Sequence, residues 1–198
     1  MDDTGVNKNI SSDVLYLKLR QKAIELTTTE PYLGNLLKRT ILHPKSTNFN
    51  SAISRIIASR VISSCGSNPI MCDDDMNKII EDAMNSKELE YGHTMADAIV
   101  EDIMACYRRD PACETELEVV LFYKGFAALV CHRAARRHYF LSQCENNHDN
   151  NCSSSCSKNK SKRFVSLWLQ SQASAAFGVD IHPAGKVICF ISDLLMCA

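Results

Sequence analysis

The sequence contains few residues that interrupt helices, with 7 glycines and 5 prolines among 198 residues. It also lacks an excess of charge of either sign, because 22 basic residues oppose 23 acidic ones. A nearly neutral chain has no general electrostatic attraction to nucleic acid or to an anionic membrane, so we exclude both as partners. The scarcity of turn-forming residues favours long helices over an all-β fold.

Long apolar runs are absent as well. No run reaches the roughly 18 residues that a membrane-spanning helix needs, and the acidic start MDDTGVNKN is unlike a secretory signal or a transit peptide. Cysteine, in contrast, is abundant, with ten residues that fall mostly in helix-like stretches. We interpret them as core residues and free thiols, which predicts a cytoplasmic protein.

Apolar residues recur at helical spacing through most of the chain. Six amphipathic helices are predicted in the first two thirds, and they begin near Ser12, Pro31, Phe49, Asp73, Met95 and Thr115. The second is expected to continue until Pro44 closes it, and the sixth to run unbroken to about Phe140. A last helix resumes at Arg163 and is ended by Gly178.

The remaining segments lack this spacing. Gln143 to Lys162 consists of Asn, Ser, Cys and Lys, a composition typical of a flexible surface loop. From about Val179 the sequence indicates a short stub of extended or β structure. The expected fold class is therefore mainly α, a multi-helix domain with that stub at its C-terminus.

Two stretches are unlike routine helix sequence. In Arg108-Arg109-Asp110-Pro111-Ala112 a carboxylate lies at a helix end beside two guanidinium groups. In F-G-V-D-I-H-P-A, residues 177–184, Asp180 precedes His182 by two residues in a turn closed by proline. Both acids also have ordinary structural interpretations, as a helix-terminal Asp before Pro and as a turn-capping acid. We interpret His182 as a structural residue of the turn.

Together with Lys124-Gly125-Phe126 and the spacing from Ala128 to Arg133, these stretches resemble the serine acetyltransferases. R-D-P-A, K-G-F-x-A and F-G-V-D-I-H-P-A follow one another in the family's order. The resemblance extends from about residue 13 to residue 186. In that family a helical N-terminal domain precedes a left-handed β-helix of hexapeptide repeats, and the enzyme transfers an acetyl group from acetyl-CoA to serine in cysteine biosynthesis.

The resemblance implies roles for both acids. Asp110 corresponds to the carboxylate that grips the serine ammonium, and Asp180 to the one that orients the catalytic histidine and contacts substrate. That histidine acts as the general base on the serine hydroxyl. L-serine is then the substrate and acetyl-CoA the co-substrate, while this chain itself is expected to bind no cofactor and no metal. Self-association is also implied, since the family's helical domains join trimers into hexamers.

The resemblance also divides the chain. It implies a disordered N-terminus at 1–12 and a serine acetyltransferase N-terminal helical domain at 13–177, with a flexible loop insertion at 143–162. Residues 178–198 would be a truncated first coil of the β-helix followed by a divergent tail. Within the matching part, Arg133-Ala134-Ala135-Arg136 replaces the family's R-I-A-H.

The sequence departs from the family after Lys186. The family histidine lies in D-H-A-T-G about fifteen residues beyond the position of Asp180, where this chain has Asp193-Leu194-Leu195-Met196, and no histidine follows His182. No hexapeptide repeat follows either, so the coils that bind CoA and the tail that docks O-acetylserine sulfhydrylase are expected to be missing. We therefore interpret the chain as a truncated or degenerate serine O-acetyltransferase, inactive alone. The alternative is a non-catalytic oligomerisation or regulatory module that associates with an intact serine acetyltransferase.

A metal site is a further alternative. Cys144, His148, Cys152 and Cys156 follow one another at four-residue steps, and thiolate and imidazole are zinc ligands. Structural zinc sites usually pair their ligands more closely, as C-x2-C, and such spacings arise readily in low-complexity segments. A flexible loop without metal is therefore the preferred interpretation.

Overall fold

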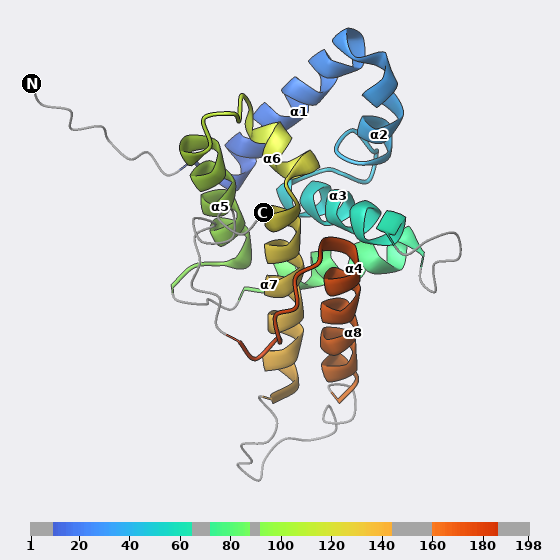
Figure 1. The fold of residues 1–198 in the computed structure, drawn as a ribbon, viewed down its shortest axis with the longest axis vertical. Helices are drawn as coiled ribbons and strands as arrows, with labels where there is room; N and C mark the ends of the chain where they lie inside the picture. Colours follow the sequence, from blue (N-terminus) through green and yellow to red (C-terminus); the bar gives the residue numbers. More distant parts are fainter. Residues whose placement is uncertain (1–9, 65–71, 88–91, 144–159, 186–198) are drawn as a thin grey trace, which may run out of the picture.

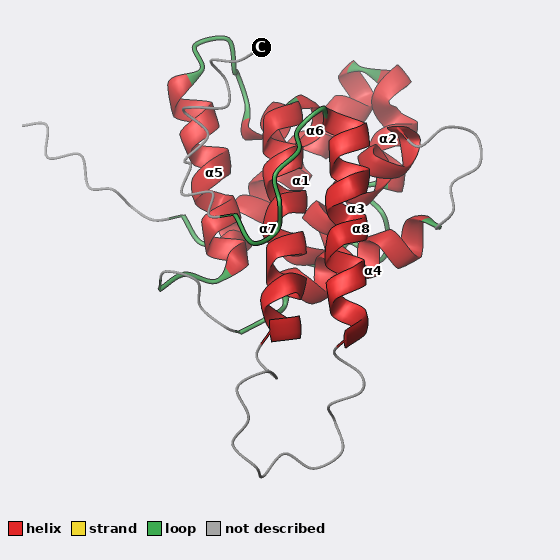
Figure 2. Cartoon of the chain, turned by 60° about the horizontal axis from the view of Figure 1, so that its bottom comes forward, coloured by secondary structure: helices red, strands yellow, loops and turns green. Residues whose placement is uncertain are grey.

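A computed structural model of the chain describes residues 10–64, 72–87, 92–143 and 160–185, and in these ranges the chain forms helices and no β-strand (Figures 1 and 2). The helices are α1 (Ser12–Thr29), η1 (Pro31–Leu33, a 3-10 turn), α2 (Gly34–Arg39), α3 (Phe49–Ser64), α4 (Asp73–Met84), α5 (Met95–Arg109), α6 (Glu116–Phe122), α7 (Lys124–Gln143) and α8 (Lys160–Phe177). This confirms the mainly α fold class.

Local sequence explains where several helices begin. The Ser11 hydroxyl accepts a hydrogen bond from the first turn of α1, which satisfies a backbone N–H that has no partner inside the helix. Thr94 and Asp97 form a reciprocal capping box at the start of α5. Pro31 opens η1, where its missing N–H is harmless.

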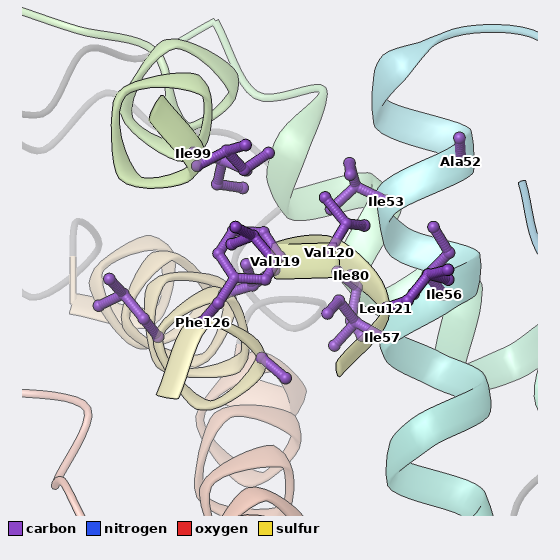
Figure 3. Packing of buried hydrophobic residues seen from close by; sticks show 14 of the residues in the cluster. Ala52, Ile53, Ile56, Ile57, Ile80, Ile99, Val119, Val120, Leu121 and Phe126 are labelled. Atoms are coloured by element: carbon purple, nitrogen blue, oxygen red, sulfur yellow. The ribbon is translucent and has the colours of Figure 1, made fainter. Parts of the chain in front are cut away.

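The core lies where α3, α5, α6 and α7 converge. α7 packs antiparallel along α8, and α3 packs against α4 (Figure 1). Figure 3 shows Ile53 of α3, Ile99 of α5, Val119 of α6 and Phe126 of α7 pointing into this core, and all four are completely buried. Burial of each such side chain contributes about 1.5–3 kcal/mol, so this core holds α5 and α7 in place. Asp110 follows the end of α5, and Tyr123 precedes the start of α7.

The second predicted helix is shorter than expected. It consists of η1 and α2, and α2 ends at Arg39, well before Pro44. Thr40 leaves helical geometry with φ −115° and ψ −105°, and its hydroxyl donates to the Leu36 carbonyl at 2.6 Å. A threonine hydroxyl that bonds the preceding turn competes with continuation of the helix.

The prediction of one unbroken sixth helix is wrong, because α6 and α7 are separate helices that meet at Tyr123. This residue has extended backbone geometry, with φ −74° and ψ 114°. The guanidinium of Arg60, from α3, stabilises the break by donating to the Val120, Phe122 and Tyr123 carbonyls. The apolar spacing continues through Tyr123, so periodicity alone could not reveal the break.

The last helix begins at Lys160, three residues before the expected Arg163. Residues 178–185 form extended and turn backbone after it, with no strand in this described stretch. The expectations for residues 1–9, 144–159 and 186–198 lie outside the described residues, and the division into domains remains a prediction. None of the described helices combines the length and apolar character needed to cross a membrane.

Candidate functional site

Asp110 lies at the end of α5 and is held by two donors. Its backbone turns away from the helix before Pro111, with φ −91° and ψ 107°. Its half-buried side chain accepts a hydrogen bond from the Ala112 N–H through Oδ1 at 2.9 Å and from the Tyr123 hydroxyl through Oδ2 at 2.6 Å. The Tyr123 hydroxyl, and then the Ala112 N–H, lower the pKa of Asp110. Asp110 is therefore an oriented carboxylate that is ionised at neutral pH.

The two arginines that precede Asp110 do not bind it. Arg108 and Arg109 are exposed, and within the described part of the chain neither has a hydrogen bond or an ion pair with Asp110. The guanidinium partners suggested by the sequence are thus replaced by a phenol from the α6–α7 junction. The same hydrogen bond raises the pKa of the Tyr123 phenol, so this residue stays protonated as a donor.

Asp180 follows the end of α8. Gly178 ends the helix in the left-handed region at φ +75°, a conformation that glycine adopts without steric cost, and its N–H donates to the Ser174 carbonyl at 2.9 Å. The Asp180 carboxylate is exposed, and its Oδ1 accepts a hydrogen bond from Nε2 of Gln170, a residue of α8, at 2.6 Å. Gln170 thus holds Asp180 beside the last turns of α8.

The segment after Asp180 is fixed against α7 (Figure 1). His182 accepts the Ala184 N–H through Nδ1 at 3.1 Å, and its ring meets the Tyr139 ring edge-on at 5.8 Å between centroids. Arg136 of α7 donates through Nη1 to the Ala184 carbonyl at 3.2 Å and the Gly185 carbonyl at 2.8 Å. These contacts agree with a structural role for His182 and give a physical role to Arg136.

The fold brings the segments of both predicted acids to the same end of the α7–α8 pair. Asp110 binds Tyr123, which directly precedes α7, and Asp180 lies three residues beyond the end of α8. Among the described residues no hydrogen bond joins the two carboxylates, and Gln170 is the partner of Asp180. An oriented anion such as Asp110 suits an ammonium group, whereas proton abstraction would require an imidazole beside Asp180.

Sequence reasoning missed the two residues that hold these acids. Tyr123 is 13 residues from Asp110, and Gln170 is 10 residues from Asp180. Tyr123 lies inside what looks like a continuous helix, and Gln170 carries no motif of its own. The signal that could have indicated Tyr123 is its phenol hydroxyl, a polar group directly before the K-G-F motif in an otherwise apolar helical stretch.

Other chemistry in the described part is limited. No group of three or more His, Cys, Asp or Glu side chains in these ranges is placed to hold a metal ion. The alternative zinc ligands Cys144, His148, Cys152 and Cys156 lie outside the described residues. Four cysteines fall inside the described ranges, and all four are free thiols: Cys72, Cys106, Cys113 and Cys131.

Comparison with solved structures first identifies the class of protein to which this fold belongs. The structure of a serine acetyltransferase in complex with CoA superposes with a TM-score of 0.68 at 31% identity, over 89% of this chain and 62% of that one. A Neisseria gonorrhoeae serine acetyltransferase in complex with serine gives a TM-score of 0.64 at 28% identity, over 86% of this chain and 58% of that one. The fold is thus that of the helical portion of such acetyltransferases.

The sequence comparisons specify the family. The family model for the N-terminal region of serine acetyltransferase matches residues 15–131. The serine acetyltransferase of Haemophilus influenzae is 34% identical over 169 residues, which cover 85% of this chain and 52% of that protein. The chain therefore belongs to the serine acetyltransferase family, as its sequence resemblance indicated. It spans about half the length of the curated relatives it matches.

Proposed function

We propose that the chain provides the serine-binding part of a serine O-acetyltransferase site. The observation that carries the proposal is Asp110, an ionised carboxylate oriented by Tyr123 and the Ala112 N–H at the end of α5. A fixed anion suits the ammonium of an amino acid. L-serine is the substrate that the family membership supports, and acetyl-CoA is the acetyl donor of the complete reaction.

Asp180 is the second proposed substrate contact. In the complete enzyme its carboxylate would orient the histidine that removes the proton from the serine hydroxyl. At the corresponding distance along this sequence stand Asp193, Leu194 and Leu195, and Asp180 is bonded to Gln170. We therefore propose that the isolated chain binds serine but does not transfer an acetyl group, because a neutral hydroxyl is too weak a nucleophile without a base.

Serine titration followed by isothermal calorimetry tests the binding step. Wild-type chain should bind L-serine, and Asp110→Asn should weaken binding at least tenfold, since a charged hydrogen-bond pair becomes a neutral one (about 1.5–3 kcal/mol). Asp73→Asn, at a half-buried acid on α4 that pairs with Arg39, is the matched control and should leave affinity unchanged. Absence of serine binding by the wild-type chain would remove the proposal.

The transfer step has its own assay. Chain mixed with L-serine and acetyl-CoA should release no CoA thiol above the rate without serine. Serine-dependent release that Asp180→Ala abolishes would show that this chain carries a complete active site after all.

Analysis of the same preparation for bound zinc tests the alternative of a metal site at Cys144, His148, Cys152 and Cys156, which requires one zinc ion per chain.

The alternative function, a non-catalytic assembly module, is favoured by the outer face of α1. Val14, Leu17 and Ile24 are 57%, 64% and 47% exposed on it, at the 3- and 7-residue steps of a helix-pairing face. We propose self-association through this face, either between copies of this chain or with an intact serine acetyltransferase.

We also propose a reducing, cytoplasmic location, which the free thiols of the described cysteines support.

A further inference from the structure

Arg60 joins the two segments that carry the proposed serine contacts. It extends from α3, which contributes neither acid, and its side chain is half-buried. Nη1 donates to the Val120 carbonyl at 3.4 Å and the Tyr123 carbonyl at 3.2 Å, and Nη2 donates to the Phe122 carbonyl at 3.2 Å. A cation that binds the last carbonyls of a helix also interacts favourably with the negative end of the helix dipole. Arg60 therefore fixes the end of α6 and the backbone of Tyr123.

The same guanidinium contacts the other segment. It lies over the Phe177 ring at 5.5 Å from the centroid, within the range of a cation–π interaction. Phe177 is the last residue of α8, and Gly178 turns the chain immediately afterwards toward Asp180. The position of the Phe177 ring on Arg60 thus sets the point from which the Asp180 segment leaves α8.

A continuous series of contacts connects Asp110 to Phe177, which lies three residues before Asp180. The Tyr123 hydroxyl holds Asp110, the Tyr123 carbonyl is held by Arg60, and Arg60 supports Phe177. A planar guanidinium can bind several carbonyls in its plane and an aromatic ring on its face at once, which the point-like ammonium of lysine cannot do. Burial lowers the pKa of Arg60, which reflects the partial loss of water around a group whose partners are supplied by the protein.

We propose that Arg60 is a positioning residue that fixes the Asp110 segment and the Asp180 segment relative to one another. This inference rests on the proposed function, in which the two carboxylates belong to one serine site. Arg60 itself does not touch the substrate. Its effect passes through Tyr123 on one side and Phe177 on the other.

Nuclear magnetic resonance of the full chain tests the proposal without substrate. The pH titration of the Asp110 carboxyl carbon reports on the Tyr123 hydrogen bond, and the Gln170 side-chain amide signal reports on Asp180. In Arg60→Lys we expect the Asp110 pKa to rise and the Gln170 signal to shift in the same protein. Arg55→Lys is the matched control, because Arg55 lies on the same helix but binds Asp74 of α4, and it should change neither signal.

Two further variants separate the arms of the connection. Tyr123→Phe should raise the Asp110 pKa and leave the Gln170 signal in place. Phe177→Leu should shift the Gln170 signal and leave the Asp110 pKa unchanged. Should Arg60→Lys fail to fold, Arg60→Gln provides the same comparison with a planar donor of lower capacity. Unchanged signals in a folded Arg60 variant, or equal changes in Arg55→Lys, would overturn the proposal, because they would show no connection or only a general effect of weakening α3.

Serine affinity provides the second measurement. Arg60→Lys should weaken serine binding about tenfold or more, as expected when a charged hydrogen-bond partner is displaced, whereas Arg55→Lys should stay within about twofold of wild type. If the wild-type chain binds no serine, the proposed function fails, and the resonance signals still decide whether Arg60 connects the two acids. Normal serine affinity in Arg60→Lys would refute the positioning role.

Discussion

At the scale of single residues, orientation and ionisation of the proposed substrate acid have the same cause. The two hydrogen bonds that orient Asp110 also lower its pKa, because both donors favour the charged carboxylate. Tyr123 contributes more than Ala112 to this effect. A site built in this way presents one preferred direction to an incoming ammonium and does not depend on the nearby but exposed Arg108 and Arg109.

Asp102 is the contrasting acid of α5. It is almost completely buried, and Arg133 of α7 binds its Oδ2 through Nε at 3.1 Å and Nη2 at 2.9 Å. Burial outweighs the nearby positive charge and raises the pKa of Asp102 from 3.8 to about 6. The pair joins α5 to α7 at an electrostatic cost that increases as Asp102 ionises.

This cost predicts a pH dependence of stability. The folded protein holds the Asp102 proton more tightly than the unfolded chain does. The contribution of Asp102 to the free energy of unfolding is therefore greatest below about pH 4, and it falls by about 3 kcal/mol as pH rises through about 6. Asp102→Asn keeps an acceptor for Arg133 but does not ionise, and should remove this fall. Urea unfolding from pH 4 to 7 measures it. The Asp73→Asn control should retain the wild-type slope, and an unchanged slope in Asp102→Asn would contradict the assignment.

At the scale of secondary-structure elements, α5 positions Asp110 because both of its ends are defined by sequence. Thr94 and Asp97 close the first turn by reciprocal hydrogen bonds, and Asp110 and Pro111 end the helix. Thr115, at the start of α6, occupies an equivalent position but makes no side-chain hydrogen bond to the helix backbone. The two threonines therefore provide a matched comparison.

Thr94→Ala should lower the free energy of unfolding by about 1 kcal/mol, because a backbone N–H of the first turn loses its partner. Thr115→Ala should cost clearly less, since only its contact with the Glu118 side chain is lost. Chemical denaturation with circular dichroism measures both. Equal losses in the two variants would show that the Thr94 cap contributes nothing beyond general packing.

At the scale of the whole molecule, the exposed face of α1 predicts association. Leu17→Glu places a charge at the centre of the apolar face and should shift the chain from an oligomer to a monomer in light scattering coupled to size-exclusion chromatography. Helix content should not change, because Leu17 lies outside the core. Phe164→Glu, at a residue of α8 that is 75% exposed, is the control and should still associate. A wild-type chain that is monomeric at every concentration would rule out the α1 interface.

Local sequence was sufficient to predict the mainly α fold, the starts of α3, α4 and α5, and the end of α5 before Pro111, because apolar spacing, caps and proline act within a few residues. It also determined family membership, through three short motifs in a fixed order. Asp110 and Asp180 could be predicted as candidates for the same reason, since each is a motif residue at the end of a helix.

How these acids are held depends on contacts between helices that the local sequence does not specify. The break at Tyr123, the hydrogen bonds of Asp110 and Asp180, and the position of Arg60 all depend on side chains that reach between helices. Arg60 lies 60 and 63 residues from the carbonyls of Val120 and Tyr123 that it binds. Contacts at such separations leave no periodic trace in a sequence, because they form only when the packing of the core has brought the helices together.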